Sequence, residues 1–279
     1  MASHAGDGRP KLRSLAEAAR LVPDGARIGF GGSNALWRRP MAFVRELIRQ
    51  ERRDLAVYNM IGGLEVDLLL GAGSVAATHC CYVGLDEFGH APHFQRAAVA
   101  GAVEINEYSE FTFVAGLRAA GMALPFLPWK TAWGTEVVER QGWHTIRCPY
   151  TGVELLAVPA NRLDVAVIHA ARCDAQGNVE LPYPLDFIYD FDYLLARAAD
   201  VVIVCAERVE PIIDATRVAM IAREVDCVVH APRGAWPCGV ASLYPVAGEH
   251  VSAYVRAARG DDFAAYLEQF VHAGEGAHV

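Results

Sequence analysis

The sequence lacks any hydrophobic run long enough to cross a membrane. Its densest apolar stretch, Val201–Ala206, has the length of a buried strand, whereas a spanning helix needs about 20 apolar residues. The first residues, MASHAGDGRPKLRS, contain no apolar core of the kind found in signal peptides. We therefore expect a soluble, cytoplasmic protein that does not associate with a membrane.

The sequence also has no excess of positive charge. Its 25 Lys and Arg residues are outnumbered by 33 Asp and Glu residues, and the formal net charge is −8. Because binding to a phosphate backbone requires clustered Lys and Arg, we expect no nucleic-acid partner. Hydrophobic residues, in contrast, make up 53% of the 279 positions. That proportion is high for a soluble monomer and suggests contacts with a partner protein.

Metal and disulfide motifs are missing as well. Seven cysteines occur without any CxxC pair, and the adjacent Cys80 and Cys81 would face opposite sides of a strand. We expect reduced structural thiols rather than disulfides or a metal site. The HxxH pair His90 and His93 has no third ligand beside it. The sequence has no P-loop, GxSxG or HExxH motif, which argues against P-loop kinases, serine hydrolases and zincins.

What the sequence does contain is a regular alternation of strand and helix patterns. Ser14 and Glu17 form a capping box at the start of a first helix. An apolar strand over 27–30, a glycine loop and a helix beginning at Pro40 then form the opening of a βαβ unit. Further strands are expected over 55–60, 75–83, 163–169, 201–204 and 227–230, and further helices over 66–70, 94–100, 110–122 and 251–271.

This alternation predicts an α/β fold with an open, mainly parallel sheet covered by helices on both faces. We expect a single domain over residues 1–279. The segment 129–151 has no period and is expected to be a long loop or excursion. In open sheets of this kind, ligands bind at the carboxyl ends of the strands. That rule directs attention to 29–34, 59–63, 104–110 and the loop after His169.

The glycine loop after the strand 27–30 does not fit a dinucleotide-binding fingerprint. Asn34 stands at the last glycine position of GxGxxG, and Asn59 stands where an acidic residue should end the second strand. The loop either lets a ligand approach the backbone or forms a tight turn. The candidate binding residues on the two loops are Gly31, Gly32, Ser33, Asn34, Gly62 and Gly63.

Two arginines, Arg38 and Arg39, stand at the start of the helix that follows the glycine loop. Positive charge there opposes the helix dipole, so another interaction must favour it. The guanidinium groups either bind an anion, such as a carboxylate or a phosphate of coenzyme A, or form salt bridges with acids of the protein.

Three carboxylates, Glu104, Glu107 and Glu110, lie in a largely apolar stretch. If the stretch is helical they share one face, whereas on a strand Glu104 and Glu107 point to opposite faces. A partly desolvated carboxylate near a cleft has a raised pKa and can act as a base or nucleophile. Glu107 is the candidate catalytic residue; the alternative is that such acids are solvated or cap a helix.

His169 follows the most apolar predicted strand. It can orient a substrate or cap a backbone group. The residues just beyond it, Asp174–Asn178, have the composition of a β-turn.

Several segments, read in order, resemble the alpha subunits of class I coenzyme A transferases. They are Gly29–Ser33, the stretch RRPMAFVRE from Arg38, and the residues 101–107, 124–128, 169–178 and 231–235. The likeness covers nearly the whole chain. It implies a fold of the NagB/RpiA/CoA-transferase type, a partner B subunit in a heterodimer or heterotetramer, and a coenzyme A thioester as substrate, with no bound cofactor. The resulting candidate substrate- and CoA-binding residues are Gly31, Gly32, Ser33, Asn34, Arg38, Arg39, Gly62, Gly63, Glu104 and His169.

The resemblance implies transfer of coenzyme A between carboxylic acids as the default reaction. In transferases of the glutaconate type the catalytic glutamate lies on the B subunit, and N–H groups of the glycine loop would stabilise the oxyanion. The arginine-rich stretch is also similar to the A subunit of a bacterial hydrolase that opens the last steroid ring of a cyclic acyl-CoA, with Glu107 as base. A third alternative is a ligand-binding module without catalytic activity.

Overall fold

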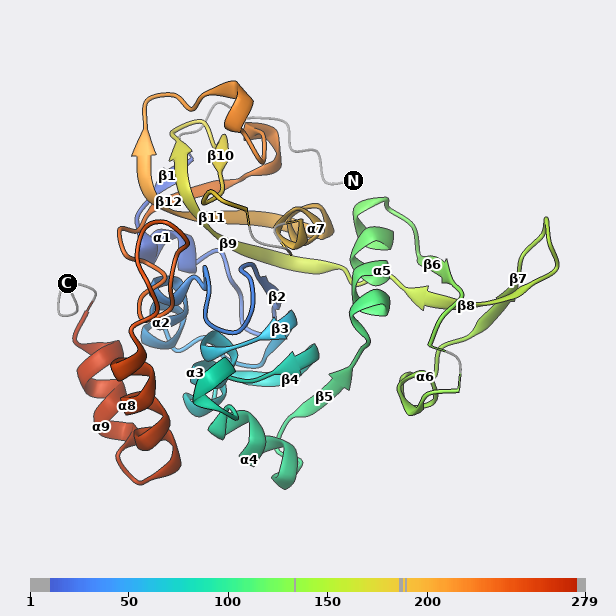
Figure 1. The fold of residues 1–279 in the computed structure, drawn as a ribbon, viewed down its shortest axis with the longest axis horizontal. Coiled ribbons are helices and arrows are strands. Elements are labelled where there is room, and N and C mark those ends of the chain that lie inside the picture. Colours follow the sequence, from blue (N-terminus) through green and yellow to red (C-terminus); the bar gives the residue numbers. More distant parts are fainter. Residues whose placement is uncertain (1–10, 133, 186–187, 189, 275–279) are drawn as a thin grey trace.

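A central, mainly parallel sheet organises the computed structural model, which describes residues 11–132, 134–185, 188 and 190–274. Across these residues the sheet has nine strands in the order β1-β12-β11-β9-β2-β3-β4-β5, with β10 beside β9 (Figure 1). All pairings are parallel except that of β10 with β9. The prediction of an open, mainly parallel sheet is confirmed. The strands are β1 Leu12–Arg13, β2 Arg27–Phe30, β3 Leu55–Gly62, β4 Val75–Val83, β5 Glu104–Glu107, β9 Leu163–Asp174, β10 Val179–Glu180, β11 Ala199–Glu210 and β12 Cys227–His230.

Helices cover both faces of this sheet, as predicted. Side chains alternate along β9: Val165 and Val167 join the core on one face, whereas Ala166 and Ile168 join the core on the other. Burial on both faces explains the unbroken apolar run of this strand. The first face carries α1 Leu15–Ala19, α2 Met41–Arg49, α3 Leu64–Gly71, α8 Gly248–Arg259 and α9 Phe263–Leu267, and the second carries α5 Glu110–Gly121 and α7 Phe191–Ala198.

The remaining helices are short or peripheral. Helix α4, Pro92–Ala100, packs against α3 and α8. Short helical turns occur at η1 Asp86–Phe88, η2 Ala215–Arg217, η3 Ala222–Glu224 and η4 Glu268–His272. No helix of the described residues is long and apolar enough to cross a membrane. All seven cysteines are free, as expected.

Local signals place the first helices as the sequence predicts. The Ser14 hydroxyl accepts a hydrogen bond from Glu17 N, and the Glu17 carboxylate accepts one from Ser14 N, which confirms the capping box. Pro40 differs slightly from the expectation, because it is the N-cap and α2 begins at Met41.

The segment expected to be a long loop, 129–151, is not irregular throughout. It contains α6 Glu136–Gln141 and β7 Thr145–Arg147, and β7 joins β6 Phe126–Trp129 and β8 Glu154–Pro159 in a small antiparallel sheet of order β6-β8-β7. Ala115, Leu156 and Val158 form its core. Elements this short do not establish a recognisable period, so the loop prediction was wrong for α6 and β7. The small sheet and α6 project from the side of the main sheet (Figure 1).

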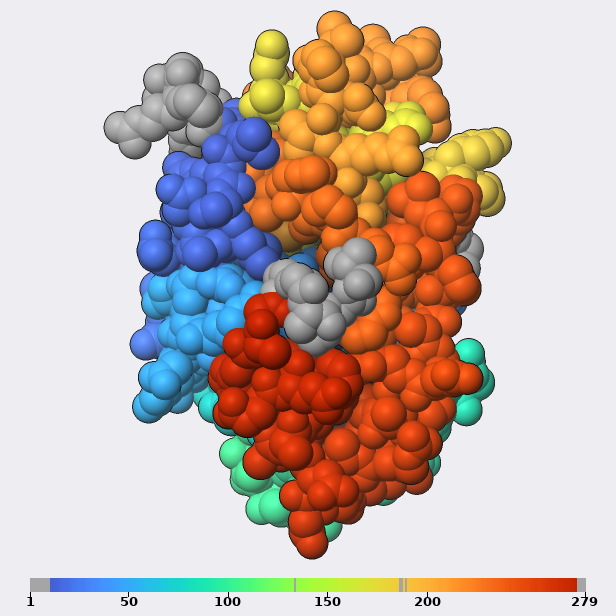
Figure 2. Space-filling view, turned by 90° about the vertical axis from the view of Figure 1, so that its left-hand side faces the viewer, coloured from blue at the N-terminus to red at the C-terminus, as the bar shows by residue number. Residues whose placement is uncertain are grey.

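The C-terminal helices close one side of the first core. Figure 2 shows the C-terminal residues (red) lying against residues near position 50 (light blue), and there Arg49 Nη1 donates to Val271 O at 2.8 Å. Deeper in the core, Tyr254 OH of α8 donates to Asp67 Oδ2 of α3 at 2.6 Å. Asp67 Oδ1 accepts from Phe94 N at 2.8 Å. One buried carboxylate therefore joins α3, α4 and α8.

A second close contact lies at the turn between β3 and α3. A Cβ atom added to Gly63 would stand 1.8 Å from Ala35 O in the glycine-rich loop that follows β2. No side chain fits there, so a glycine is needed for the two loops to approach each other.

Stability should depend on pH through Asp67. Burial raises the pKa of Asp67 to about 6 from 3.8, outweighing the hydrogen bonds from Tyr254 and Phe94. A raised pKa means that folding favours the protonated acid. Its stabilising contribution is complete below about pH 4 and is lost as the pH rises through about 6. The shift corresponds to about 3 kcal/mol. We expect the free energy of unfolding of the wild type to fall relative to that of Asp67→Asn between pH 4 and 7 in urea titrations. A difference that does not vary with pH would contradict this assignment.

Replacing Gly63 by alanine should force the two loops apart. Because backbone rather than a flexible side chain opposes the new Cβ, we expect the variant to lose about 1–3 kcal/mol or more in denaturant unfolding. Gly260→Ala is the matched control, since a Cβ there meets only Arg256 O at 3.4 Å. Equal stability of the two variants would show that the loops separate without cost.

Candidate functional site

The glycine loop after β2 is a tight turn whose first N–H groups already have acceptors. Gly31 N donates to Val167 O at 2.8 Å, and Gly32 N donates to Asp192 Oδ1 at 2.9 Å. Ser33 N donates to Trp37 O at 3.0 Å. Gly32 has a φ of 118°, which favours glycine. An oxyanion bound to this loop must therefore displace one of these acceptors or use other N–H groups.

Arg38 is buried and paired with an acid from the opposite helix layer. Its side chain is 2% exposed, and its Nη1 lies 2.5 Å from Asp192 Oδ2 at the start of α7. Since Asp192 also accepts from Gly32 N, this carboxylate fastens the glycine loop to α7.

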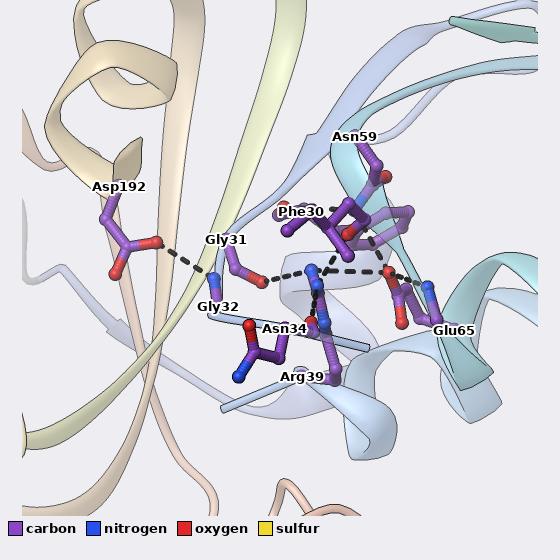
Figure 3. A network of polar contacts seen from close by, with 10 residues as sticks. Phe30, Gly31, Gly32, Asn34, Arg39, Asn59, Glu65 and Asp192 are labelled. Atoms are coloured by element: carbon purple, nitrogen blue, oxygen red, sulfur yellow. Dashed lines mark hydrogen bonds and ion pairs between the residues drawn. The ribbon is translucent and has the colours of Figure 1, made fainter. Parts of the chain in front are cut away.

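Arg39 joins the two glycine-containing loops. Its side chain is 1% exposed, and its Nη1 lies 3.3 Å from Glu65 Oε1 and donates to Gly31 O at 3.3 Å. Its Nη2 donates to Ile61 O at 2.5 Å and also to Asn34 O. Figure 3 shows the guanidinium of Arg39 between Gly31, Asn34 and Glu65. Of the two interpretations of the arginines, the salt bridges with acids of the chain are confirmed.

Glu65, at the start of α3, completes the network. It is 0% exposed, and its Oε1 accepts from Asn59 Nδ2 at 3.0 Å and from Gly63 N at 3.1 Å (Figure 3). Asn59 Nδ2 also donates to Phe30 O at the end of β2. Burial raises the pKa of Glu65, although the charge of Arg39 and the N–H of Gly63 oppose the rise. The carboxylate thus links β2, β3 and α3 in a dry interior.

His169 lies in a separate buried cluster. Its ring is 0% exposed, and Nε2 lies 2.8 Å from Glu207 Oε1 on β11. Glu207 also accepts from Arg233 N at 2.6 Å and from Tyr244 OH. Burial acts to raise the pKa of Glu207, but the hydrogen bonds from His169 and Tyr244 outweigh it and leave that pKa lowered. Glu207, with His169 beside it, therefore fastens the segment 233–244 to the sheet.

The three glutamates do not form a cluster on one face. Glu104 and Glu107 are the first and last residues of β5, so they point to opposite faces, as expected for an extended stretch. Glu110 is the first residue of α5, after the N-cap Ser109. All three are exposed, and the side chain of Asn106 donates to Glu104.

Glu107 borders two hollow spaces beside β5. One cavity of ≈ 370 Å³ lies between Glu107, Phe111, Thr131 and Val137. Another, of ≈ 330 Å³, lies between Glu107, Ile105 and Gln141. Gln141 Nε2 donates to Glu107 O at 2.9 Å and holds the end of α6 against β5. A carboxylate on the wall of two cavities of this size can position a small ligand or exchange a proton with it.

The sheet register relates Glu107 to the buried network. Glu107 pairs with Cys80, and Cys80 pairs with Asn59. Strands about 4.8 Å apart place the Cα atoms of Glu107 and Asn59 roughly 10 Å from each other. The structure thus brings Gly31, Gly32, Ser33, Asn34, Arg39, Gly62 and Gly63 together, joins Arg38 to them through Asp192, and sets Glu104 and Glu107 on the edge strand.

Sequence reasoning missed the acids that organise the site: Glu65, Asp192 and Glu207. A signal for Glu65 exists, because LEVDLLLG is apolar around its whole circumference except for Glu65 and Asp67. A helix of that kind is buried, and acids within it need partners. No group of three or more His, Cys, Asp or Glu side chains in the described ranges is arranged to hold a metal ion.

The sequence matches known proteins over most of its length. An uncharacterised protein of Archaeoglobus fulgidus is 32% identical over 94% of this chain, which spans only 59% of that protein. The cholesterol ring-cleaving hydrolase IpdA subunit of Rhodococcus jostii is 34% identical, over 81% of this chain and 80% of its own. The A subunit of the glutaconate CoA-transferase of Acidaminococcus fermentans is 29% identical, over 94% of this chain and 88% of its own.

Solved structures agree with these matches. The glutaconate coenzyme A-transferase of Acidaminococcus fermentans superposes with a TM-score of 0.86 at 28% identity, over 95% of this chain and 90% of that chain. A variant of the decarboxylase AibA/AibB superposes with a TM-score of 0.85 at 32% identity, over 95% and 100% of the two chains. The profile of the coenzyme A transferase family matches residues 12–226. Because this match covers more than half of the sequence, the chain belongs to the coenzyme A transferase family.

Proposed function

We propose that this chain is the A subunit of a heteromeric, cytoplasmic enzyme that transfers coenzyme A between carboxylic acids. The observation that carries the proposal is the likeness to the A subunit of glutaconate CoA-transferase, which extends over 94% of this chain. The exposed carboxylate of Glu107 beside two cavities supports it. The coenzyme A thioester is the substrate, and no further cofactor is required.

A second subunit is part of this proposal. Several relatives are named as subunits. The chain matches only 41% of the human succinyl-CoA:3-ketoacid coenzyme A transferase 2, so that longer relative has room for another unit. We expect a B subunit in a heterodimer or heterotetramer, seated so that Glu107 becomes part of a closed cleft.

The proposed chemistry divides between the two subunits. In the B subunit, a glutamate attacks the thioester carbonyl, the C–S bond breaks, coenzyme A leaves as thiolate and an acyl–enzyme anhydride forms. The thiolate then attacks the glutamyl carbonyl carbon, and the first acid leaves as a carboxylate. The acceptor carboxylate attacks the resulting enzyme thioester and displaces the thiolate. The thiolate finally attacks the acceptor's acyl carbon, which gives the new acyl-CoA and frees the glutamate. This chain supplies the cavities beside Glu107 for the acyl group and the buried network that holds the glycine loop.

The candidate binding residues take two roles in this proposal. Asn34, Glu104 and Glu107 keep exposed or half-buried surface and are the residues that contact substrate. The buried set, which is Gly31, Gly32, Ser33, Arg38, Arg39, Gly62, Gly63 and His169, positions the loops that form the cleft.

Hydrolysis of a carbon–carbon bond in a cyclic acyl-CoA, with Glu107 as base, is the alternative to transfer. The similarity to the IpdA subunit, which is named as part of a ring-cleaving hydrolase, supports this alternative. The comparisons do not favour it, because proteins named for transfer and for decarboxylation match this chain over a larger share of its length. A ligand-binding module without catalysis would show neither reaction.

Replacing Glu107 by glutamine separates these alternatives. We expect the purified complex with the B subunit to transfer coenzyme A from acetyl-CoA to short-chain carboxylates. The variant should retain this transfer to within about tenfold, because the attacking glutamate lies on the B subunit. If Glu107 were a general base, its loss would lower the rate about 10²–10⁴-fold. Acceptor-dependent formation of the new acyl-CoA, followed by chromatography, is the measurement. Glu139→Gln, an exposed acid on α6, is the matched control.

Two outcomes would contradict the transferase assignment. One is breakdown of a cyclic β-diketone acyl-CoA without an acceptor that disappears in Glu107→Gln but persists in Glu139→Gln. That result would make Glu107 the base of a hydrolase. The other is a stable complex that converts no acyl-CoA at all, as expected for a binding module.

A further inference from the structure

We propose that Glu65 is a positioning residue, which holds Arg39 in the geometry that shapes the glycine loop. This inference rests on the proposed function for its catalytic consequence. Its structural content, that one buried carboxylate sets the conformation of the loop, is independent of the reaction.

Arg39 lies between separate segments of backbone. Its guanidinium donates to Gly31 O and Asn34 O in the loop after β2, and to Ile61 O near the end of β3. These three carbonyls are the points at which the two loops are joined by one side chain (Figure 3). A rotation of Arg39 would release all of them together.

The position of Arg39 depends on the charge of Glu65. The guanidinium is 1% exposed, and Glu65 is the acid with which it forms an ion pair. A buried charge without a partner is strongly unfavourable, so Arg39 would leave this position if Glu65 lost its charge. Glu65 Oε1 also accepts from Gly63 N and from Asn59 Nδ2. The same oxygen therefore orients the turn after β3 and the arginine.

The network also contains buried polar atoms to which no described residue forms a hydrogen bond. Three of its buried polar atoms, Glu65 Oε2, Arg39 Nε and Asn59 Oδ1, have no hydrogen-bond partner among the described residues. Buried ionic groups of this kind are often no more stabilising than apolar side chains of similar volume. Stability alone therefore does not explain why buried polar atoms without a partner are present. Pre-organisation of a functional site is one explanation. The register of β3, β4 and β5 sets this network about 10 Å from Glu107, within the span of one acyl-CoA substrate.

Asp67 provides a matched control within the same helix. It is as fully buried as Glu65, but its partners are Tyr254 and Phe94 N on the side of the C-terminal helices. Glu65→Gln removes the charge and keeps an acceptor for Gly63 and Asn59. Asp67→Asn makes the same chemical change two residues away, without touching Arg39.

The decisive experiment is amide hydrogen exchange of the full complex, read by mass spectrometry for the wild type, Glu65→Gln and Asp67→Asn. The amides of Gly31, Gly32 and Ser33 are hydrogen-bonded, so their protection reports the loop directly. We expect exchange in the peptide that covers them to accelerate at least about tenfold in Glu65→Gln, the equivalent of ~1.4 kcal/mol of opening. Exchange in this peptide should be unchanged in Asp67→Asn, even if the two variants have the same melting temperature.

Kinetics test the consequence for the reaction. With acetyl-CoA and propionate, we expect Glu65→Gln to lower kcat about tenfold or more with little change in KM for acetyl-CoA, because a misplaced loop costs mainly in the transition state. Asp67→Asn should retain its kcat. Protection of the loop that stays at the wild-type level in Glu65→Gln, or that falls equally in both variants, would overturn the proposal. Lost loop protection without any acyl-CoA turnover in the wild type would instead support the positioning role and refute the proposed function.

Discussion

The buried ion pair between Arg39 and Glu65 is the interaction on which the site depends. Two charges removed from water are stabilised by each other and by the hydrogen bonds that they form, and removal of one member costs about 3–5 kcal/mol. Here the partners are backbone groups at Gly31, Asn34, Ile61 and Gly63. The ion pair thereby fixes the position of the two loops relative to each other.

The parallel topology makes that relation possible. Because β2 and β3 are parallel neighbours, their carboxyl ends and the loops that follow them meet at one edge of the sheet. The loops come so close that Gly63 has no room for a Cβ beside Ala35 O. From the other helix layer, Asp192 reaches the same loop through Gly32 N and Arg38. The glycine loop is therefore held from both faces of the sheet by carboxylates that the solvent does not reach.

The sequence predicts the local features of this arrangement but not the contacts between residues far apart in the chain. Strands such as β4 and β12 were predicted to the residue, because their apolar runs end at turn residues. The exposed elements α6 and β7 were missed because six and three residues are too few to show a period. Arg38 and Arg39 were recognised as needing an anion, yet their partners lie 154 and 26 residues away in the chain. A single sequence does not pair residues over such distances, so Asp192 and Glu65 could be assigned as the partners only from the structure.

The contrast between the buried network and the exposed Glu107 supports the proposal that a second subunit takes part in the chemistry. A carboxylate in water is fully solvated, and its attack on a thioester gains from the exclusion of that water. The buried carboxylates of the network, Glu65 and Asp192, are already paired with arginines. The carboxylate that borders the cavities, Glu107, lies on an edge strand open to solvent. A partner subunit that covers the edge of β5, as proposed above, would create a dry cleft there and bring the reacting carboxylate from a separate chain.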